Sequence, residues 1–205
     1  SRAALPHGFL QASAITEEAD GGTTFLSHVD ARAGGMTPNT SYQYARFDTA
    51  GLQKVSLDDE SALNSLAWDI AVRRYIVRIN SGVAGPSCVE AARVPNTTFD
   101  ALTTVPAGLS WRTEAYFSAT CDYVPDTSGI GAPGTALSSF WQYTSCVKMT
   151  NNLFVVHLRD GRYVKLQVVS YYDPAAQDAC QTTDVAPMPN GAGNVRIKWA
   201  FIPGP

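Results

Sequence analysis

The chain has 205 residues, of which 45% are apolar and 16% charged, and its formal net charge is −3. This length is enough for one all-β domain with a substantial core, and no apolar run approaches the ~18 residues that a membrane-spanning helix requires. The arginines are dispersed without basic tracts, so the charge pattern argues against nucleic acid as a partner. We expect a single domain over residues 1–205, with residues 1–22 as an N-terminal extension.

The first third of the chain has the pattern of a β-meander. Tyr42, Tyr44 and Phe47 alternate with polar residues, which predicts a strand with one buried face. The predicted elements, in chain order, are at best a short helical turn over 15–19, strands over 23–29, 42–47 and 52–57, and a helical turn over 58–66 that Asp58 or Asp59 would cap.

Residues 68–82 combine a core signal with a strand signal. Tyr75, Val77 and Ile79 alternate with Arg74, Ile76 and Arg78. This pattern predicts one strand, apolar on one side and mainly basic on the other, that stops at the turn cluster 80–82. We expect Trp68 to anchor the core and Asp69 to contact nearby backbone or an arginine.

The middle of the chain is less regular. Residues 94–106 predict a loop that returns to the sheet, and residues 115–124 predict a strand. Residues 125–137 are rich in Gly, Pro, Ser and Thr, so we expect an excursion that packs little and moves more than the rest.

The C-terminal part contains the strongest local signal. Residues 153–173 predict two strands joined at Asp160-Gly161, a dipeptide typical of two-residue hairpin turns. A loop over residues 173–194 then leads to a last strand over residues 195–202, where apolar and basic residues alternate.

Three motifs together carry a family resemblance: Trp68-Asp-Ile-Ala71, Asn80-Ser-Gly82, and Asp160-Gly-Arg-Tyr-Val-Lys-Leu-Gln-Val-Val-Ser-Tyr-Tyr172. With these motifs the chain resembles the HmuY-like family of bacterial surface and secreted proteins, over residues 47–201. The resemblance implies an all-β fold, mostly an antiparallel sheet or sandwich with long loops and little helix. It also implies haem capture at the cell surface, the role of the members that gave the family its name.

Four widely spaced cysteines, Cys88, Cys121, Cys146 and Cys180, form no Cys-x-x-Cys motif, which argues against zinc and covalent haem. We expect two disulfides and therefore an exported protein, at the outer-membrane surface or outside the cell. Three pairings are open, and we favour Cys88–Cys121 with Cys146–Cys180 because each would join neighbouring β segments. We expect any export signal or lipid anchor to lie outside this sequence.

Motifs for catalysis are missing from the sequence. It contains no nucleophile elbow, zinc-binding helix, phosphate loop or dinucleotide fingerprint. Asp58-Asp59-Glu60 lacks the spaced oxygens and the turn glycine of a calcium loop, and is better explained as a solvated helix cap. We therefore do not expect an enzyme.

Haem is the ligand that the resemblance implies, and its iron takes imidazole or thioether donors. In the family the iron is held by a pair of His, or by Met in relatives, on loops near one end of the sheet. The candidate donors in this chain are Met149, His157, Met36 and Met188. Each also has an ordinary structural explanation, such as a strand histidine at 157 or a surface loop methionine at 36 or 188. His7 precedes the recognisable domain, and His28 lies near a strand end before it.

A second hypothesis stays open because the chain lacks a clear pair of axial donors. It is a structural or adhesive interaction module that keeps the fold without haem and engages a protein partner or another copy of itself. Capture of haem, a related tetrapyrrole or another small hydrophobic ligand is the first hypothesis, and a hemin absorption titration separates it from the second.

Overall fold

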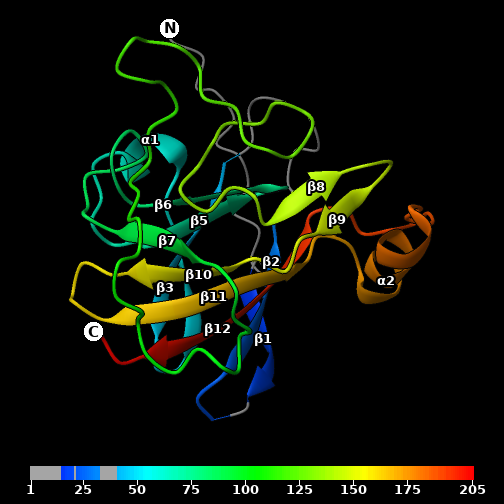
Figure 1. The fold of residues 1–205 in the computed structure, drawn as a ribbon, viewed down its shortest axis with the longest axis horizontal. Coiled ribbons are helices and arrows are strands. Elements are labelled where there is room, and N and C mark those ends of the chain that lie inside the picture. The colour runs from blue at the N-terminus through cyan, green and yellow to red at the C-terminus, as the bar shows by residue number, and fades with distance from the viewer. Residues whose placement is uncertain (1–14, 21, 33–40) are drawn as a thin grey trace, which may run out of the picture.

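Two antiparallel β-sheets, a small hairpin sheet and two short helices make up the computed structural model in Figure 1, which describes residues 15–20, 22–32 and 41–205. The six-stranded sheet has the order β1 (Ile15–Asp20), β2 (Phe25–Asp30), β12 (Asn194–Ile202), β11 (Tyr163–Ser170), β10 (Leu153–His157), β7 (Glu90–Val94). The four-stranded sheet has the order β4 (Gly51–Val55), β3 (Gln43–Asp48), β5 (Ile70–Arg73), β6 (Ile76–Ile79). The remaining elements are β8 (Trp141–Tyr143), β9 (Val147–Met149), α1 (Asp59–Ala62) and α2 (Pro174–Thr183).

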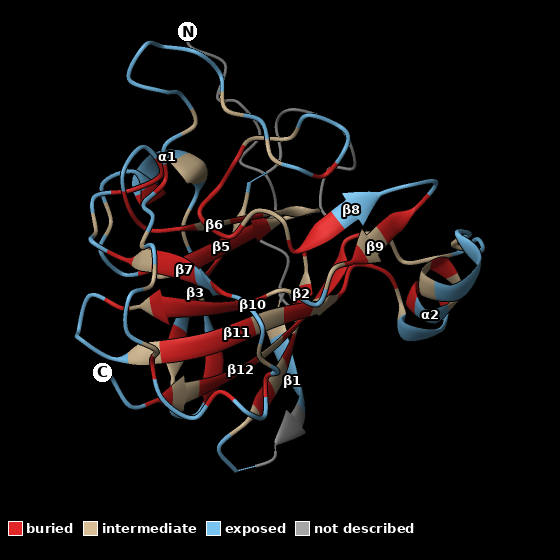
Figure 2. Ribbon diagram, in the orientation of Figure 1, coloured by how far each residue is buried: buried red, intermediate tan, exposed pale blue. Residues whose placement is uncertain are grey.

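The main core lies between the two large sheets. Alternate strand residues point inward, so buried residues are concentrated in the strands, as Figure 2 shows. The Trp199 ring joins the two sheets: Phe47 meets it edge-on with centroids 4.9 Å apart, and Phe25 stacks on it at 4.4 Å. The strands and the apolar core between the sheets confirm the expected all-β fold with little helix.

The outer face of the six-stranded sheet is covered by residues 95–111. Phe99, Leu102 and Val105 are buried there against strand residues, as expected for a loop that returns to the sheet. The Lys165 ammonium lies below this segment and donates to the carbonyls of Phe99 and Leu102 at 2.7 and 3.0 Å. A buried lysine therefore holds the loop in place through backbone carbonyls.

The outer face of the four-stranded sheet is covered by α1 and the residues after it. Trp68 is fully buried there and meets Tyr44 edge-on at 5.0 Å. Asp69 accepts a hydrogen bond from the Phe47 backbone N–H at 3.0 Å. Asp58 caps α1 by accepting from the Ser61 N–H at 2.7 Å. These placements confirm the roles predicted for Trp68, Asp69 and the acidic cap.

The strands predicted over 23–29, 42–47, 52–57 and 195–202 and the hairpin at Asp160-Gly161 are confirmed by β2, β3, β4, β12 and the β10–β11 pair. Gly161 has φ +86°, which explains why a glycine is suited to that turn. Among the described residues, no helix is both long and apolar enough to span a bilayer.

Two predictions near the N-terminal half were wrong. Residues 15–20 form strand β1 and not a helical turn, because they pair with β2 across a local turn. Residues 68–82 contain the hairpin β5–β6 and not one strand, because the chain reverses at Arg74, whose φ is +50°. The turn contains no Gly, Pro or Asn, so the sequence carried no turn signal there.

Three predictions for the middle and the C-terminal part also need correction. Residues 115–124 form no strand and contain one bridge, Phe117 to Tyr123, because no strand lies beside them to pair with. Residues 125–137 do pack, since Ser128, Thr135 and Leu137 are buried. The loop predicted over 173–194 contains helix α2, which is held by polar side chains rather than by a long apolar face.

Candidate functional site

The predicted donor Met149 lies in β9 and points into the main core, where it is buried. The Gln181 side-chain amide accepts from the Met149 N–H at 2.7 Å and donates to its carbonyl at 3.1 Å. A thioether held in a close-packed core cannot reach a haem iron unless the core opens.

His157 lies at the end of β10 on the outer face of the six-stranded sheet. Its ring stacks on Tyr163 with centroids 4.4 Å apart and planes 9° apart, and the Trp111 ring lies 6.0 Å away. Its Nδ1 is 3.8 Å from a Glu90 carboxylate oxygen, which orients the ring. These contacts give His157 a structural role, and its side chain is only one-third exposed (33%).

Met188 is the described candidate with open access to solvent. It is 81% exposed and lies between Pro187 and Pro189, in the segment that follows α2. Met36 lies outside the described residues.

The three described candidates do not converge on one site. Met149 points into the core, His157 lies on the outer face of a sheet, and Met188 extends into solvent. In the described part of the chain, no group of three or more His, Cys, Asp or Glu side chains is placed to hold a metal ion. The protein therefore shows no axial pair for a haem iron among these residues.

Large hydrophobic side chains gather instead on residues 115–137 and the neighbouring strand β8. We call this set the apolar rim; its members are Phe117, Tyr123, Ile130 and Tyr143, which are 61%, 47%, 45% and 47% exposed. In Figure 1 the green segment that contains residues 115–125 projects from the sheets at the upper left, above α1. Exposed apolar side chains that cluster in this way mark a binding surface more often than isolated ones do.

Hydrogen bonds and one ring contact link the chain segments that carry the apolar rim. The Phe117 and Tyr123 rings meet edge-on at 5.9 Å, and the Tyr123 hydroxyl donates to the Gly131 carbonyl at 3.0 Å. On the other side, the Tyr143 N–H donates to the Ser128 carbonyl at 2.7 Å. The rim is thus a fixed feature of the fold, built from three chain segments.

A buried carboxylate fastens this region to the four-stranded sheet. Glu114 is 1% exposed, and its two oxygens accept from the N–H groups of Ile79 and Ala136 at 2.9 and 3.1 Å. Burial raises the pKa of Glu114 to about 7, and these hydrogen bonds offset only part of that effect. Glu114 therefore positions the excursion that carries the apolar rim.

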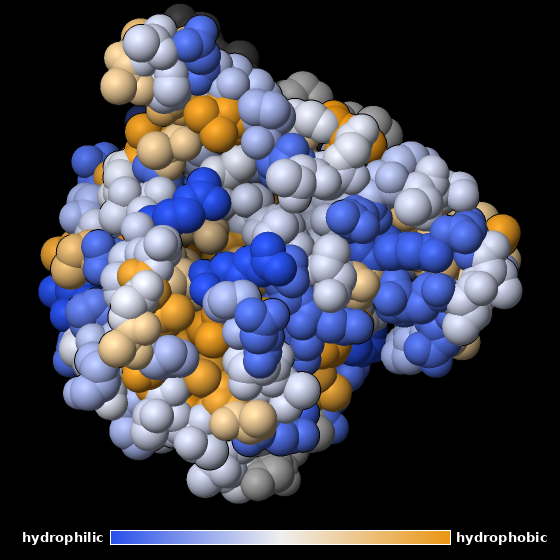
Figure 3. All heavy atoms as spheres, in the orientation of Figure 1, coloured by the Kyte–Doolittle hydropathy of each residue, from blue (hydrophilic) through white to orange (hydrophobic). Residues whose placement is uncertain are grey.

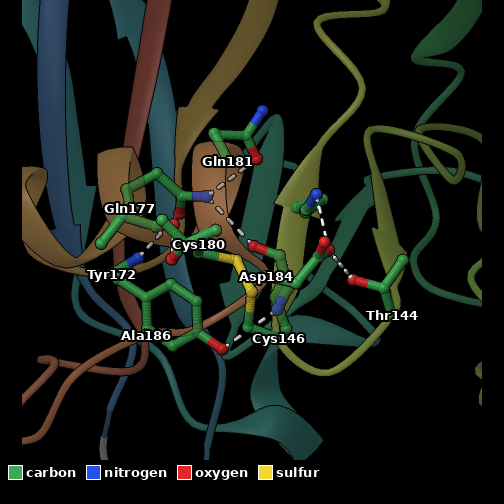
Figure 4. The surroundings of a disulfide bond; sticks show 12 residues. Thr144, Cys146, Tyr172, Gln177, Cys180, Gln181, Asp184 and Ala186 are labelled. Carbon is green, nitrogen blue, oxygen red and sulfur yellow. Dashed lines mark hydrogen bonds and ion pairs between the residues drawn. A yellow bond between two sulfur atoms is a disulfide. The ribbon is translucent and has the colours of Figure 1, made fainter.

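The end of α2 approaches the rim beside Tyr143. Asp184 accepts from the Thr144 hydroxyl at 2.9 Å and forms an ion pair with Lys148 at 2.6 Å. Figure 4 shows Asp184 directed toward Thr144, with Ala186 beside the disulfide. Met188 follows Asp184 by four residues in the sequence.

The disulfide Cys146–Cys180, which the sequence predicted, ties this hairpin to α2. Figure 4 shows Gln177 and Gln181 extending from α2, and Gln177 donates to the Val147 carbonyl at 3.0 Å. The side-chain amides of Gln177 and Gln181 thus satisfy backbone groups at the outer edge of β9, so another strand cannot pair there.

The second predicted disulfide, Cys88–Cys121, is not formed, and both thiols are free and exposed. Cys88 is held beside Ser81 at the start of β7, whereas Cys121 lies in a tight turn closed on Ser118. The two cysteines belong to separate, independently fixed segments, which sequence spacing does not reveal.

A surface cleft of about 450 Å³ lies where residues 95–110 leave β7. Val94, Leu102 and Leu109 line it, with Arg93 at its border. Figure 3 shows hydrophobic residues gathered over β10 and β11 on this face. The cleft is a second place where a small hydrophobic ligand would find apolar contacts.

A strand was predicted over residues 115–124, and a strand would bury one of its faces. The aromatic rings of this segment are exposed instead. The Gly, Pro and Ser residues that flank this segment could have revealed the rim, because they supply no second apolar segment to cover the rings.

Comparison with known proteins gives one family. Residues 38–183 match the family model described as HmuY protein. A candidate lipoprotein from Bacteroides fragilis has a similar structure, with a TM-score of 0.57 and 17% identity over 91% of this chain and 95% of that one. A candidate HmuY-like haem-binding protein from Bacteroides vulgatus has a TM-score of 0.57 and 18% identity over 91% and 96%. At such identities these structures show the fold alone. No curated protein matches the chain in sequence.

Proposed function

The chain belongs to the HmuY family, and we propose that it is an exported, non-enzymatic protein that captures haem or a related tetrapyrrole at the bacterial cell surface. The family assignment supports the haem class of ligand. The disulfide Cys146–Cys180 supports an oxidising compartment and therefore export.

The observation that carries the proposal is the apolar rim. A tetrapyrrole is a large, flat and mostly apolar molecule, and it gains most from aromatic side chains that are already exposed and fixed. Phe117 and Tyr123 present such rings, and Tyr143 presents another from β8. The rim also adjoins strand β8, which is followed by strand β9 with the candidate donor Met149.

The described residues fit the body of the tetrapyrrole better than its iron. They offer no pair of axial donors, and Met188 is the candidate that a surface ligand could reach without opening the core. A thioether is a soft donor that suits ferrous iron more than ferric iron. We therefore propose Met188 as the donor.

A hemin absorption titration of the purified protein tests the proposal. The expected result is a sharp shift of the Soret band that saturates at a stoichiometric ratio of hemin to protein. Haem capture would be refuted by a spectral change that does not saturate, or by the same spectral change with an unrelated β protein of similar size.

The choice of donor is tested with Met188→Ala and His157→Ala, titrated with hemin under oxidising and reducing conditions. We expect Met188→Ala to weaken binding by at least about ten-fold, with the larger loss for ferrous haem. His157→Ala serves as the matched control and should bind as the wild type does. The reverse pattern would move the site to the outer face of the six-stranded sheet.

A second candidate function has a specific observation in its favour. The described donors are dispersed, so the same rim could serve as the contact surface of an interaction module that keeps the fold without haem. A protein that shows no hemin complex and associates with itself or with a surface partner through Phe117 and Tyr123 would have this function.

A further inference from the structure

The β5–β6 hairpin, at one edge of the four-stranded sheet, concentrates positive charge on a protein of net charge −3. Its three arginines, Arg73, Arg74 and Arg78, form no ion pair with any described carboxylate. By contrast, four other arginines each have a carboxylate partner: Arg32, Arg46, Arg162 and Arg196. Among the side chains that the structure does not describe, one is a carboxylate, that of Asp20.

Two of these guanidinium groups share one aromatic ring. Cζ of Arg78 lies 3.8 Å from the centroid of Tyr42, and Cζ of Arg73 lies 4.7 Å from the same centroid. Arg78 is opposite Ala71 in the β5–β6 register, so Arg73 is its diagonal neighbour on the outer face of the sheet. The ring holds two cations side by side.

Most of their hydrogen-bond donors are unused. Arg78 donates to the Tyr44 hydroxyl at 2.6 Å, but its buried Nε has no hydrogen-bond partner. The Arg73 side chain donates no hydrogen bond to the described residues. Two adjacent like charges repel each other, and a bound anion would relieve that repulsion.

The neighbouring carboxylates, Asp59 and Glu114, accept hydrogen bonds from groups other than Arg73 and Arg78. Asp59 accepts from the Tyr42 N–H and the Tyr44 hydroxyl, at 3.0 and 2.8 Å. Glu114 accepts from the backbone N–H groups of Ile79 and Ala136. Neither carboxylate forms an ion pair with Arg73 or Arg78, although Glu114 lies close enough for the Arg78 charge to oppose the rise in its pKa.

We propose that Arg73 and Arg78, supported by the Tyr42 ring, form a binding site for an oxyanion, the carboxylate or phosphate group of a small ligand. The planar guanidinium fork matches the two oxygens of either group, and stacking on Tyr42 fixes the plane of each fork before the ligand arrives. Arg78 also interacts with the Tyr116 hydroxyl, so the site adjoins the segment that carries the apolar rim, but it does not require haem.

The experiment follows the Nε–Hε signals of protein labelled with ¹⁵N-arginine while inorganic phosphate or succinate is added, at ionic strength matched with sodium chloride. We expect saturable shifts at Arg73 and Arg78 that sodium chloride alone does not produce. Saturation with succinate alone identifies a carboxylate site, saturation with phosphate alone a phosphate site, and saturation with both a general oxyanion site.

Arg73→Gln should weaken this binding at least ten-fold, and Arg73→Lys should restore part of it, since a lysine keeps the charge but loses the fork. Arg93→Gln is the matched control, because Arg93 is exposed on β7 of the other sheet. The proposal is overturned if no shift saturates, if all arginines shift alike, or if Arg73→Gln binds as tightly as Arg93→Gln does.

Discussion

Trp68 occupies a site that leaves its ring no access to water. It is 0% exposed under α1, and its indole N–H donates to the Ala62 carbonyl at 3.1 Å. Its removal therefore takes away buried apolar area and leaves a cavity between helix and sheet.

We expect Trp68→Ala to lower the free energy of unfolding by about 3–5 kcal/mol, measured by urea denaturation. Leu66→Ala is the matched control, because Leu66 is 48% exposed two residues earlier and should change stability by about 0.5 kcal/mol or less. Equal midpoints for the two variants would show that Trp68 does not anchor this layer.

Glu114 makes the stability of the fold depend on pH. Its pKa is raised from 4.5 to about 7 by burial, so the folded state prefers the protonated acid. The stabilisation from that preference is fully present below pH 4.5 and is lost as the pH rises to about 7.

The Glu114→Gln variant stays neutral over this range, so its stability relative to the wild type should improve as the pH rises. We expect a relative gain of about 3 kcal/mol between pH 4.5 and pH 8, measured by denaturation at several pH values. Any constant loss from the amide that replaces an acceptor oxygen cancels in this comparison. A difference that does not change with pH would mean that the pKa of Glu114 is not raised in the folded protein.

Helix α2 depends on its neighbours more than on its own sequence. The disulfide joins it to β9 across a separation of 34 residues, and Gln177 and Gln181 bond to the β9 backbone. By closing a loop of that length, the disulfide restricts the conformations of the unfolded chain. This restriction is the main reason that a disulfide stabilises the folded protein.

We expect Cys146→Ala with Cys180→Ala to lower the free energy of unfolding by roughly 3–4 kcal/mol, from the loop-closure relation. The matched control is Cys88→Ala with Cys121→Ala, which removes two exposed free thiols and should cost about 0.5 kcal/mol or less. Intact mass spectrometry of the oxidised wild type should show a loss of two hydrogens. A loss of four would contradict the free state of Cys88 and Cys121.

At the scale of the whole molecule, stability and binding lie in different places. The sheets, their two covering layers and Trp199 hold the fold together, whereas the apolar rim projects from residues 115–137 and adds little to the core. Substitutions in the rim should therefore alter binding without altering stability.

We expect the double variant Phe117→Ser with Tyr123→Ser to lose about 1–2 kcal/mol of hemin affinity, a factor of about 5–30, with a melting temperature close to that of the wild type. Val83→Ser is the control, since Val83 is 58% exposed but lies outside the rim. Unchanged hemin affinity in the double variant would exclude the rim as the haem contact.

Strand patterns were predictable from the sequence because they are local. The alternation in β12, the Asp160-Gly161 turn and the Asp58 cap depend on residues that are close along the chain, and all three are confirmed. The turn at Arg74 was missed because none of the usual turn residues is present, and β1 was missed because only pairing with β2 makes it a strand.

By itself, the sequence determined the fold class, the family, the strand periodicity, the role of Trp68 and one of the two expected disulfides. Only the tertiary structure decided that Met149 is buried and Met188 exposed, that Cys88 and Cys121 stay apart, and that two arginines share the ring of Tyr42. Exposure, thiol pairing and the meeting of like charges all depend on which distant segments pack together, and the periodic pattern of a single strand carries no information about that packing.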